Sequence, residues 1–171
     1  QLKDLQYSGS NLRVEIDDRD LRGGEKYWQW VKKGIPVTIE IGPRDLDNNT
    51  VFFGRRDHGA KRDGMGISEF IKQVPDILED IQKSLFQRAL SFRQEHTRVI
   101  DSKEEFYDFF TSADHKNKEI HGGFALVHWD RDPKWEEQIK NDLKVTIRCI
   151  PEDSKDSGVC IFSGNESPGR V

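Results

Sequence analysis

The segment KKGIPVTIEIGPRDLDNNTVFF, residues 32–53, decides the fold class of this 171-residue chain. Residues 36–41 and 50–53 are rich in β-branched and aromatic side chains, a composition typical of strands. The triplet Asp47-Asn48-Asn49 between them favours a turn, because Asp and Asn side chains bond their own backbone. The segment therefore predicts two strands joined by a turn.

The residues before this segment predict a helix and a further strand. Residues 25–33 place apolar side chains at helical spacing, and Gly34 supplies a stop for that helix. Residues 12–16 alternate apolar and polar side chains with period two, which indicates a strand. The order strand, helix, strand, strand predicts the α/β class.

A long amphipathic helix is predicted to follow from Ile67. Apolar side chains recur there at steps of three and four residues up to Phe92. Pro75 falls inside this pattern, and since proline removes one backbone hydrogen bond, we expect it to split the helix.

A second, smaller α/β unit is predicted after the long helix. Ser102 and Glu105 form a capping box, which predicts a helix start. Strands are predicted over residues 124–129 and 145–150, with a helix over residues 134–143 between them.

Composition narrows the classes of function. Lys and Arg number 27 against 31 Asp and Glu, so the formal net charge is −4, and no apolar run approaches the ~18 residues that span a bilayer. Two cysteines, Cys149 and Cys160, cannot build a disulfide scaffold, which favours a reducing compartment. With a single Met and no leader pattern, we expect the chain to be a piece of a longer protein.

The sequence offers no sign of a catalyst. It contains no phosphate-binding glycine loop, no nucleophile elbow and no zinc-protease motif. Five histidines are scattered without a Ser or Cys at a catalytic spacing, and surface or capping roles are expected for them: His58, His96, His115, His121 and His128.

Basic and aromatic residues are interleaved between residues 27 and 62. Aromatic faces and guanidinium planes hold unstacked bases, while Lys and Arg neutralise phosphates. The alternative is an ordinary solvated face above core aromatics. Residues 1–66 carry a net charge of +1 and the remainder −5, so an anionic partner is expected on the first third. The basic residues are Lys32, Lys33, Arg44, Arg55, Arg56, Lys61 and Arg62.

Four segments carry a family resemblance along nearly the whole chain. They are VEIDDRD (14–20), KGIPVTIEIGPRD (33–45), RALSFRQEHT (88–97) and VTIRCIP (145–151). The first two resemble the anticodon-binding domain of class II aminoacyl-tRNA synthetases. The last two narrow the resemblance to the archaeal/eukaryotic-like form of prolyl-tRNA synthetase, which is also found in many bacteria.

The resemblance implies an organisation and a partner. Residues 1–66 would be an anticodon-binding domain with a mixed sheet and flanking helices, N-terminally incomplete. Residues 67–97 would be a linking helix, and residues 98–171 a small α/β C-terminal domain. The parent enzyme would be a cytoplasmic homodimer that joins proline to its tRNA using ATP and Mg²⁺. The fragment, without the catalytic domain, would hold no cofactor and would bind the tRNA for proline, with no membrane partner.

The resemblance also assigns residues to base reading. Arg44, after Gly42-Pro43, would read a guanine of the proline anticodon, and Asp45 and Asp47 are candidate carboxylates beside it. An ion pair of Arg44 with either aspartate is the alternative. Arg55, Arg56, Lys32 and Lys33 are candidate RNA contacts, and pairing of the two arginines with Asp57 or Asp63 explains them equally well. Where the family has glutamate and arginine, this chain has Val31 and Thr38.

The C-terminal domain departs from the family at a metal site. The family often carries a structural zinc held by four cysteines, whose positions here are Asp130, Trp135, Cys160 and Ser163. Trp and Ser supply no thiolate or imidazole, so we expect no zinc and expect Trp135 to fill the space as an apolar plug. A rearranged site from His128, Asp130 and Cys160 is the alternative. A competing function for the whole chain is a diverged structural or protein-interaction module.

Overall fold

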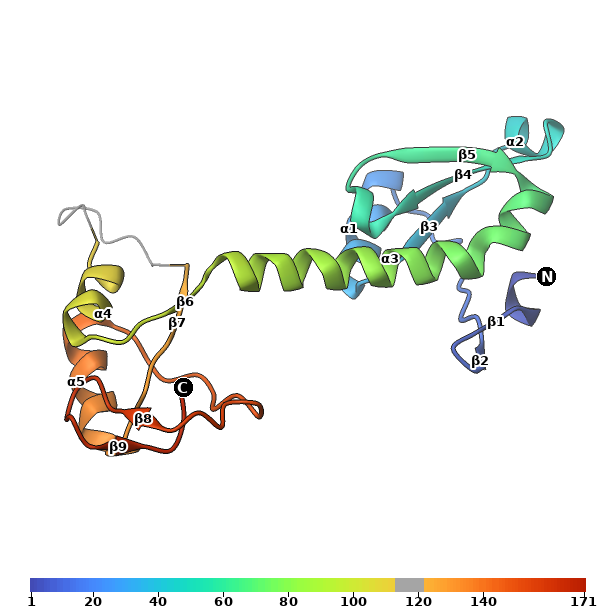
Figure 1. The fold of residues 1–171 in the computed structure, drawn as a ribbon. Helices are drawn as coiled ribbons and strands as arrows, with labels where there is room; N and C mark the ends of the chain where they lie inside the picture. The colour runs from blue at the N-terminus through green and yellow to red at the C-terminus, as the bar shows by residue number, and fades with distance from the viewer. Residues whose placement is uncertain (113–121) are drawn as a thin grey trace. The chain divides into compact units, whose positions relative to one another are not determined.

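The computed structural model describes residues 1–112 and 122–171 and is drawn in Figure 1. The chain divides into two compact units, Gln1–Ala89 and Leu90–Val171. Both contain helices and strands, which confirms the α/β class. Within the described ranges, none of the helices combines the length and apolarity of a membrane span.

The first unit is built on a three-stranded sheet in the order β3-β4-β5. β3 (Val37–Glu40) and β4 (Thr50–Arg55) are the two predicted strands, and β5 (Arg62–Gly66) completes the sheet. Both pairings are antiparallel, so a mixed sheet is not found among the described residues of this unit. β5 escaped prediction because its sequence, RDGMG, has two glycines and one large apolar side chain.

One face of this sheet packs against α3 (Ile67–Glu95). The helix buries side chains at the expected spacing, and these join inward-facing strand residues in one core. Its members are Val51, Phe53, Phe70, Val74, Ile77 and Ile81, with Val37, Ile39 and Met65 packed around them.

The expected break of the helix at Pro75 is wrong, because α3 continues through it as one helix. An interior proline costs about 3 kcal/mol. Val74 and Ile77 on either side of it are buried in the core, and burial of such side chains stabilises by about 1.5–3 kcal/mol each. The core therefore outweighs the lost hydrogen bond, and the first turns of the helix run at an angle to the rest (Figure 1).

The strand predicted over residues 12–16 is also not formed. The N-terminal segment instead contains the short helix η1 (Leu2–Asp4) and the hairpin β1 (Gln6–Tyr7) and β2 (Ser10–Asn11). Leu12 packs against the core, but no described strand pairs with residues 12–16 and Ile16 is exposed. Alternation alone does not make a strand, because a strand also needs a partner for its backbone.

Three short helical elements border the sheet of the first unit. α1 (Gly23–Lys33) precedes β3 and ends at Gly34, whose φ of 77° is the left-handed conformation that the stop requires. α2 (Pro43–Asp47) joins β3 to β4 where only a turn was predicted. The 3₁₀ helix η2 (Arg56–His58) joins β4 to β5.

The second unit has its own sheet and core. β6 (Thr97–Val99) and β7 (Phe124–Leu126) pair in parallel, and α4 (Lys103–Phe110) and α5 (Pro133–Leu143) pack beside them. The oxygen Oγ of Ser102 accepts the backbone N–H of Glu105, as the predicted cap requires. The pair β8 (Gly158–Val159) and β9 (Glu166–Ser167) lies near the C-terminus. The buried core consists of Ile100, Phe106, Val127 and Ile139.

Residues 145–150 form no strand, contrary to the prediction. Val145 and Ile147 pack against the core of the second unit, so the alternation correctly identified the inward side chains. The backbone groups of Val127 that follow β7 are bonded to Val171 instead. The segment therefore buries one face without joining a ladder.

Candidate nucleic-acid interface

The face of the β3-β4-β5 sheet opposite α3 carries polar and aromatic side chains. Thr38 and Glu40 on β3, Phe52 on β4 and Arg62 on β5 alternate with the core residues, so all four project from this second face. Phe52 is 48% exposed. An aromatic ring and charged groups thus share a surface that the fold does not bury.

Helix α1 borders this face through Tyr27. The guanidinium carbon of Arg62 lies 4.7 Å from the centroid of the Tyr27 ring, and the ring of Trp28 meets Tyr27 edge-on at 5.4 Å. Trp28 itself is largely exposed. Two aromatic rings from α1 therefore lie at or near the guanidinium of β5.

Asp17 anchors α1 to the preceding loop. Its carboxylate accepts the indole N–H of Trp30 at 2.7 Å and two hydrogen bonds from the guanidinium of Arg19, at 2.8 and 2.7 Å. The Arg19 hydrogen bonds hold the pKa of the Asp17 carboxyl well below its usual range. No role for Asp17 was predicted from the sequence; the signal for this anchor is the Asp-x-Arg spacing ahead of a tryptophan-bearing helix.

The basic residues of the α1 C-terminus gather around Gly34. The Lys33 ammonium lies 4.1 Å from the centroid of the Trp30 ring, and Lys32 is exposed. Arg56, the first residue of η2, donates a hydrogen bond from Nη1 to the Gly34 carbonyl at 3.0 Å. Three of the predicted RNA contacts therefore lie at one end of the sheet, where α1 leads into β3.

Arg44, Asp45 and Asp47 lie on α2, beyond the other end of β3 (Figure 1). The Asp45 carboxylate accepts the backbone N–H of Gly42 at 2.7 Å and so caps α2. Arg44 and Asp47 are exposed, and neither has an ion-pair partner within the part of the chain that the structure describes. The guanidinium of Arg44 is thus open to an external acceptor.

Arg55 is placed differently from the other predicted contacts. Its guanidinium donates to the Asp57 carboxylate at 3.0 and 2.8 Å and also pairs with Asp80 on α3. The Arg55 side chain is only 12% exposed and that of Asp57 is fully covered. These hydrogen bonds lower the pKa of Asp57 below its usual range. Its placement favours the ion-pair alternative, in which Arg55 joins β4 to the helix.

Two families match successive parts of the chain. Residues 3–77 match the family described as "Anticodon binding domain", and residues 114–171 match "Prolyl-tRNA synthetase, C-terminal". This chain carries the anticodon-binding and C-terminal domains of the prolyl-tRNA synthetases. The first unit, with its open sheet face and basic ends, contains the anticodon-binding match.

Individual relatives agree with this assignment. The chain is 45% identical to a proline–tRNA ligase 2 from Anaeromyxobacter dehalogenans over its whole length, and 44% identical to a proline–tRNA ligase from Protochlamydia amoebophila over 98% of it. The chain spans 34% and 33% of the length of those two relatives. A crystal structure of prolyl-tRNA synthetase from Cryptosporidium parvum, complexed with L-proline and AMP, is similar with a TM-score of 0.66 and 27% identity, over 93% of this chain and 32% of that one.

The positions at which the resemblance places zinc ligands make other contacts in this structure. Asp130 accepts the hydroxyl of Ser163 at 2.6 Å and the amide of Asn165 at 3.2 Å, and these bonds lower its pKa. The Trp135 ring stacks on Phe162, with centroids 5.8 Å apart, and Cys160 is buried.

This donor set does not fit a structural zinc. An indole cannot ligate, the Ser163 hydroxyl is bonded to Asp130, and residues 1–112 and 122–171 hold no group of three His, Cys, Asp or Glu side chains placed around a metal. His128, which belongs to the alternative rearranged site, lies beside Ser167 and Asp156. Its Nδ1 is 3.3 Å from Oγ of Ser167 and its Nε2 is 3.6 Å from Oδ2 of Asp156. His115 and His121 fall outside the described residues.

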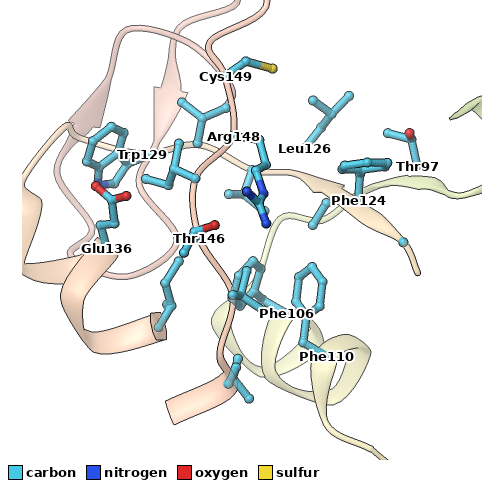
Figure 2. Close-up of a pocket in the computed structure, with 18 of the residues that line it drawn as sticks. Thr97, Phe106, Phe110, Phe124, Leu126, Trp129, Glu136, Thr146, Arg148 and Cys149 are labelled. Atoms are coloured by element: carbon cyan, nitrogen blue, oxygen red, sulfur yellow. The ribbon is translucent and has the colours of Figure 1, made fainter. Parts of the chain in front are cut away.

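A large groove of about 1900 Å³ lies in the C-terminal domain. Its lining is mostly apolar and includes Phe106 and Phe110 of α4 and Phe124 and Leu126 of β7 (Figure 2). Arg148 and Cys149, from the segment that follows α5, also line it (Figure 2). Phe106, Val127 and Ile139 of the buried core of this unit also line the groove.

Proposed function

We propose that this chain is the tRNA-selecting portion of a prolyl-tRNA synthetase and that its first unit binds the proline anticodon. The observation that carries the proposal is the exposed guanidinium of Arg44 beside the Gly42-Pro43 helix start, on the domain that matches the anticodon-binding family. Proline anticodons share two adjacent guanines, and a forked guanidinium suits the O6/N7 edge of guanine.

The surrounding charges suit an RNA backbone. Lys32, Lys33 and Arg56 converge at the end of α1, where phosphates gain several cations at once. The exposed carboxylate of Asp47 can accept hydrogen bonds from the N–H donors of a base, whereas the Asp45 carboxylate already accepts the Gly42 N–H and caps α2. We therefore assign base reading to Arg44 and Asp47, and backbone contacts to the α1 terminus.

We extend the proposal to the whole enzyme from the resemblance and the named relatives. The parent would be a homodimeric cytoplasmic enzyme of the archaeal/eukaryotic-like type that joins proline to its tRNA with ATP and Mg²⁺. Those cofactors would act in a catalytic domain outside residues 1–171. Residues 1–66, 67–97 and 98–171 would be its anticodon-binding domain, linking helix and C-terminal domain.

Binding of anticodon stem-loops tests the proposal. A loop with both guanines should bind better than one with adenines in their place, by about 1–3 kcal/mol for each base read. Arg44→Ala should reduce this preference. Arg56→Ala should weaken both loops alike and lower the salt slope by about 1. Equal affinity of the wild-type chain for the two loops would refute the proposal and favour a protein-interaction module.

A further inference from the structure

Arg62 lies in a cross-strand row that holds its guanidinium flat on the sheet. Thr38, Gly54 and Arg62 are paired in register across β3, β4 and β5. Because Gly54 has no side chain, the guanidinium extends over it toward Thr38. A Cβ atom at position 54 would overlap the Arg62 guanidinium and lie 3.1 Å from the Thr38 hydroxyl. The glycine therefore provides the space in which Arg62 is held.

The next row supplies a carboxylate and an aromatic ring. Glu40, Phe52 and Gly64 are paired in register, and the Phe52 ring rests over Gly64, where an added Cβ would be 3.0 Å away. Glu40 Oε1 lies 3.7 Å from Arg62 Nη2, and their side chains are 71% and 28% exposed. That separation is longer than a hydrogen bond. Arg62 Nη1 also donates a long hydrogen bond of 3.5 Å to the Lys61 carbonyl, and the guanidinium has further N–H donors for a ligand.

These three groups together match an unstacked guanine better than a phosphate. Arg62 presents N–H donors for O6 and N7, Glu40 presents acceptors for the N1 and N2 donors, and Phe52 presents a ring on which the base can stack. A phosphate would suffer repulsion from the carboxylate of Glu40. Adenine places a donor where guanine has O6, so it would meet the guanidinium donors with its own amino group.

We propose, on the basis of the RNA-binding function proposed above, that Arg62 and Glu40 with Phe52 form a guanine-recognition site on the open sheet face. Arg62 and Glu40 are the residues that determine its base specificity. Tyr27 positions Arg62 by stacking against its guanidinium.

The test measures the affinity of the full 171-residue chain for the proline anticodon stem-loop and for loops with each guanine changed to adenine. Arg62→Gln and Glu40→Gln should each lower the preference for guanine at one of the two positions about tenfold. Arg88→Gln, which removes the same charge from an exposed site on α3, should leave the preference unchanged. Circular dichroism and thermal melts establish that each variant is folded.

The outcomes separate this site from the general function. If the wild-type chain shows no preference between the loops, the proposed anticodon function itself fails. If the wild type discriminates and both folded variants discriminate equally well, the function stands and this site is wrong. Equal weakening of all loops by Arg62→Gln, with a lower salt slope, would make Arg62 a phosphate contact and also overturn the site.

Discussion

Trp135 offers the sharpest test of how the C-terminal domain holds together without thiolate ligands. Its ring stacks on Phe162 with an interplanar angle of 21°, and Phe162 meets the core residue Phe106 edge-on at 5.3 Å. The indole N–H of Trp135 is buried and has no acceptor among the described residues. The side chain thus combines a favourable apolar contact with an unfavourable buried donor.

Two substitutions separate the contribution of the ring stack from that of the buried indole N–H. Trp135→Ala removes the stack, and we expect a loss of about 3 kcal/mol, the low end of the range for core aromatics because the residue is half-buried. Trp135→Phe keeps the stack, loses roughly 40 Å² of apolar contact, or about 1 kcal/mol, and removes an orphan donor that costs about 1–3 kcal/mol. The Phe variant should therefore be at least as stable as the wild type.

Urea denaturation followed by circular dichroism provides the assay. With an m value of about 2 kcal/mol/M, Trp135→Ala should lower the midpoint of the C-terminal transition by about 1.5 M. Trp28→Ala, at an exposed position of the first unit, is the control and should change stability by less than about 0.5 kcal/mol. Equal destabilisation by Ala and Phe at position 135 would refute the reasoning, because it would mean that the indole N–H is stabilising.

Three further predictions concern pH, the helix proline and metal. Because the guanidinium of Arg55 lowers the pKa of Asp57, their pairing stabilises the first unit above the unfolded carboxyl pKa of about 4 and is lost as the pH falls below it. Urea midpoints measured from about pH 6 to about pH 2 should therefore fall less steeply for Asp57→Asn. Pro75→Ala should stabilise α3 by about 1–2 kcal/mol, since it restores a hydrogen bond in the helix, and an unchanged midpoint would contradict this. Zinc measured by atomic emission should be clearly substoichiometric, and a chelator should leave the melting temperature unchanged; a chelator-induced loss would instead support a site at His128, Asp130 and Cys160.

Local patterns predicted those elements whose stabilising contacts are local. The helix that ends at Gly34 and the cap at Ser102 depend on neighbours within a few residues, and both are confirmed. The predictions of a helix break at Pro75 and of a strand over residues 12–16 were wrong because their outcome does not depend on local contacts. The structure of each segment depends on residues far away in the sequence. The buried face of α3 stabilises the helix through Pro75, and no described strand pairs with residues 12–16.

The proposed guanine site could not be predicted from the sequence because it depends on cross-strand register. Alternation in β3 and β4 indicates which side chains point inward, but it does not show which outward side chains are neighbours. Gly54 and Arg62 become partners only through the pairing of β4 with β5, and the composition of β5 gives almost no strand signal. Arg62 is one of seven basic residues between positions 32 and 62, and only the register distinguishes it from the others.

Arg44 and Arg55 show why residue type and local context cannot assign a role by themselves. Each is followed within three residues by an aspartate, so the same ion-pair alternative applied to both. Arg55 points to the core side of the sheet, where Asp57 is fully covered and Asp80 approaches from α3. Arg44 lies after β3 on α2, where the neighbouring carboxylate in the sequence, Asp45, accepts the Gly42 N–H. A carboxylate 25 residues away thus completes the pairing of Arg55, whereas the capping role of Asp45 leaves Arg44 without an ion pair among the residues that the structure describes.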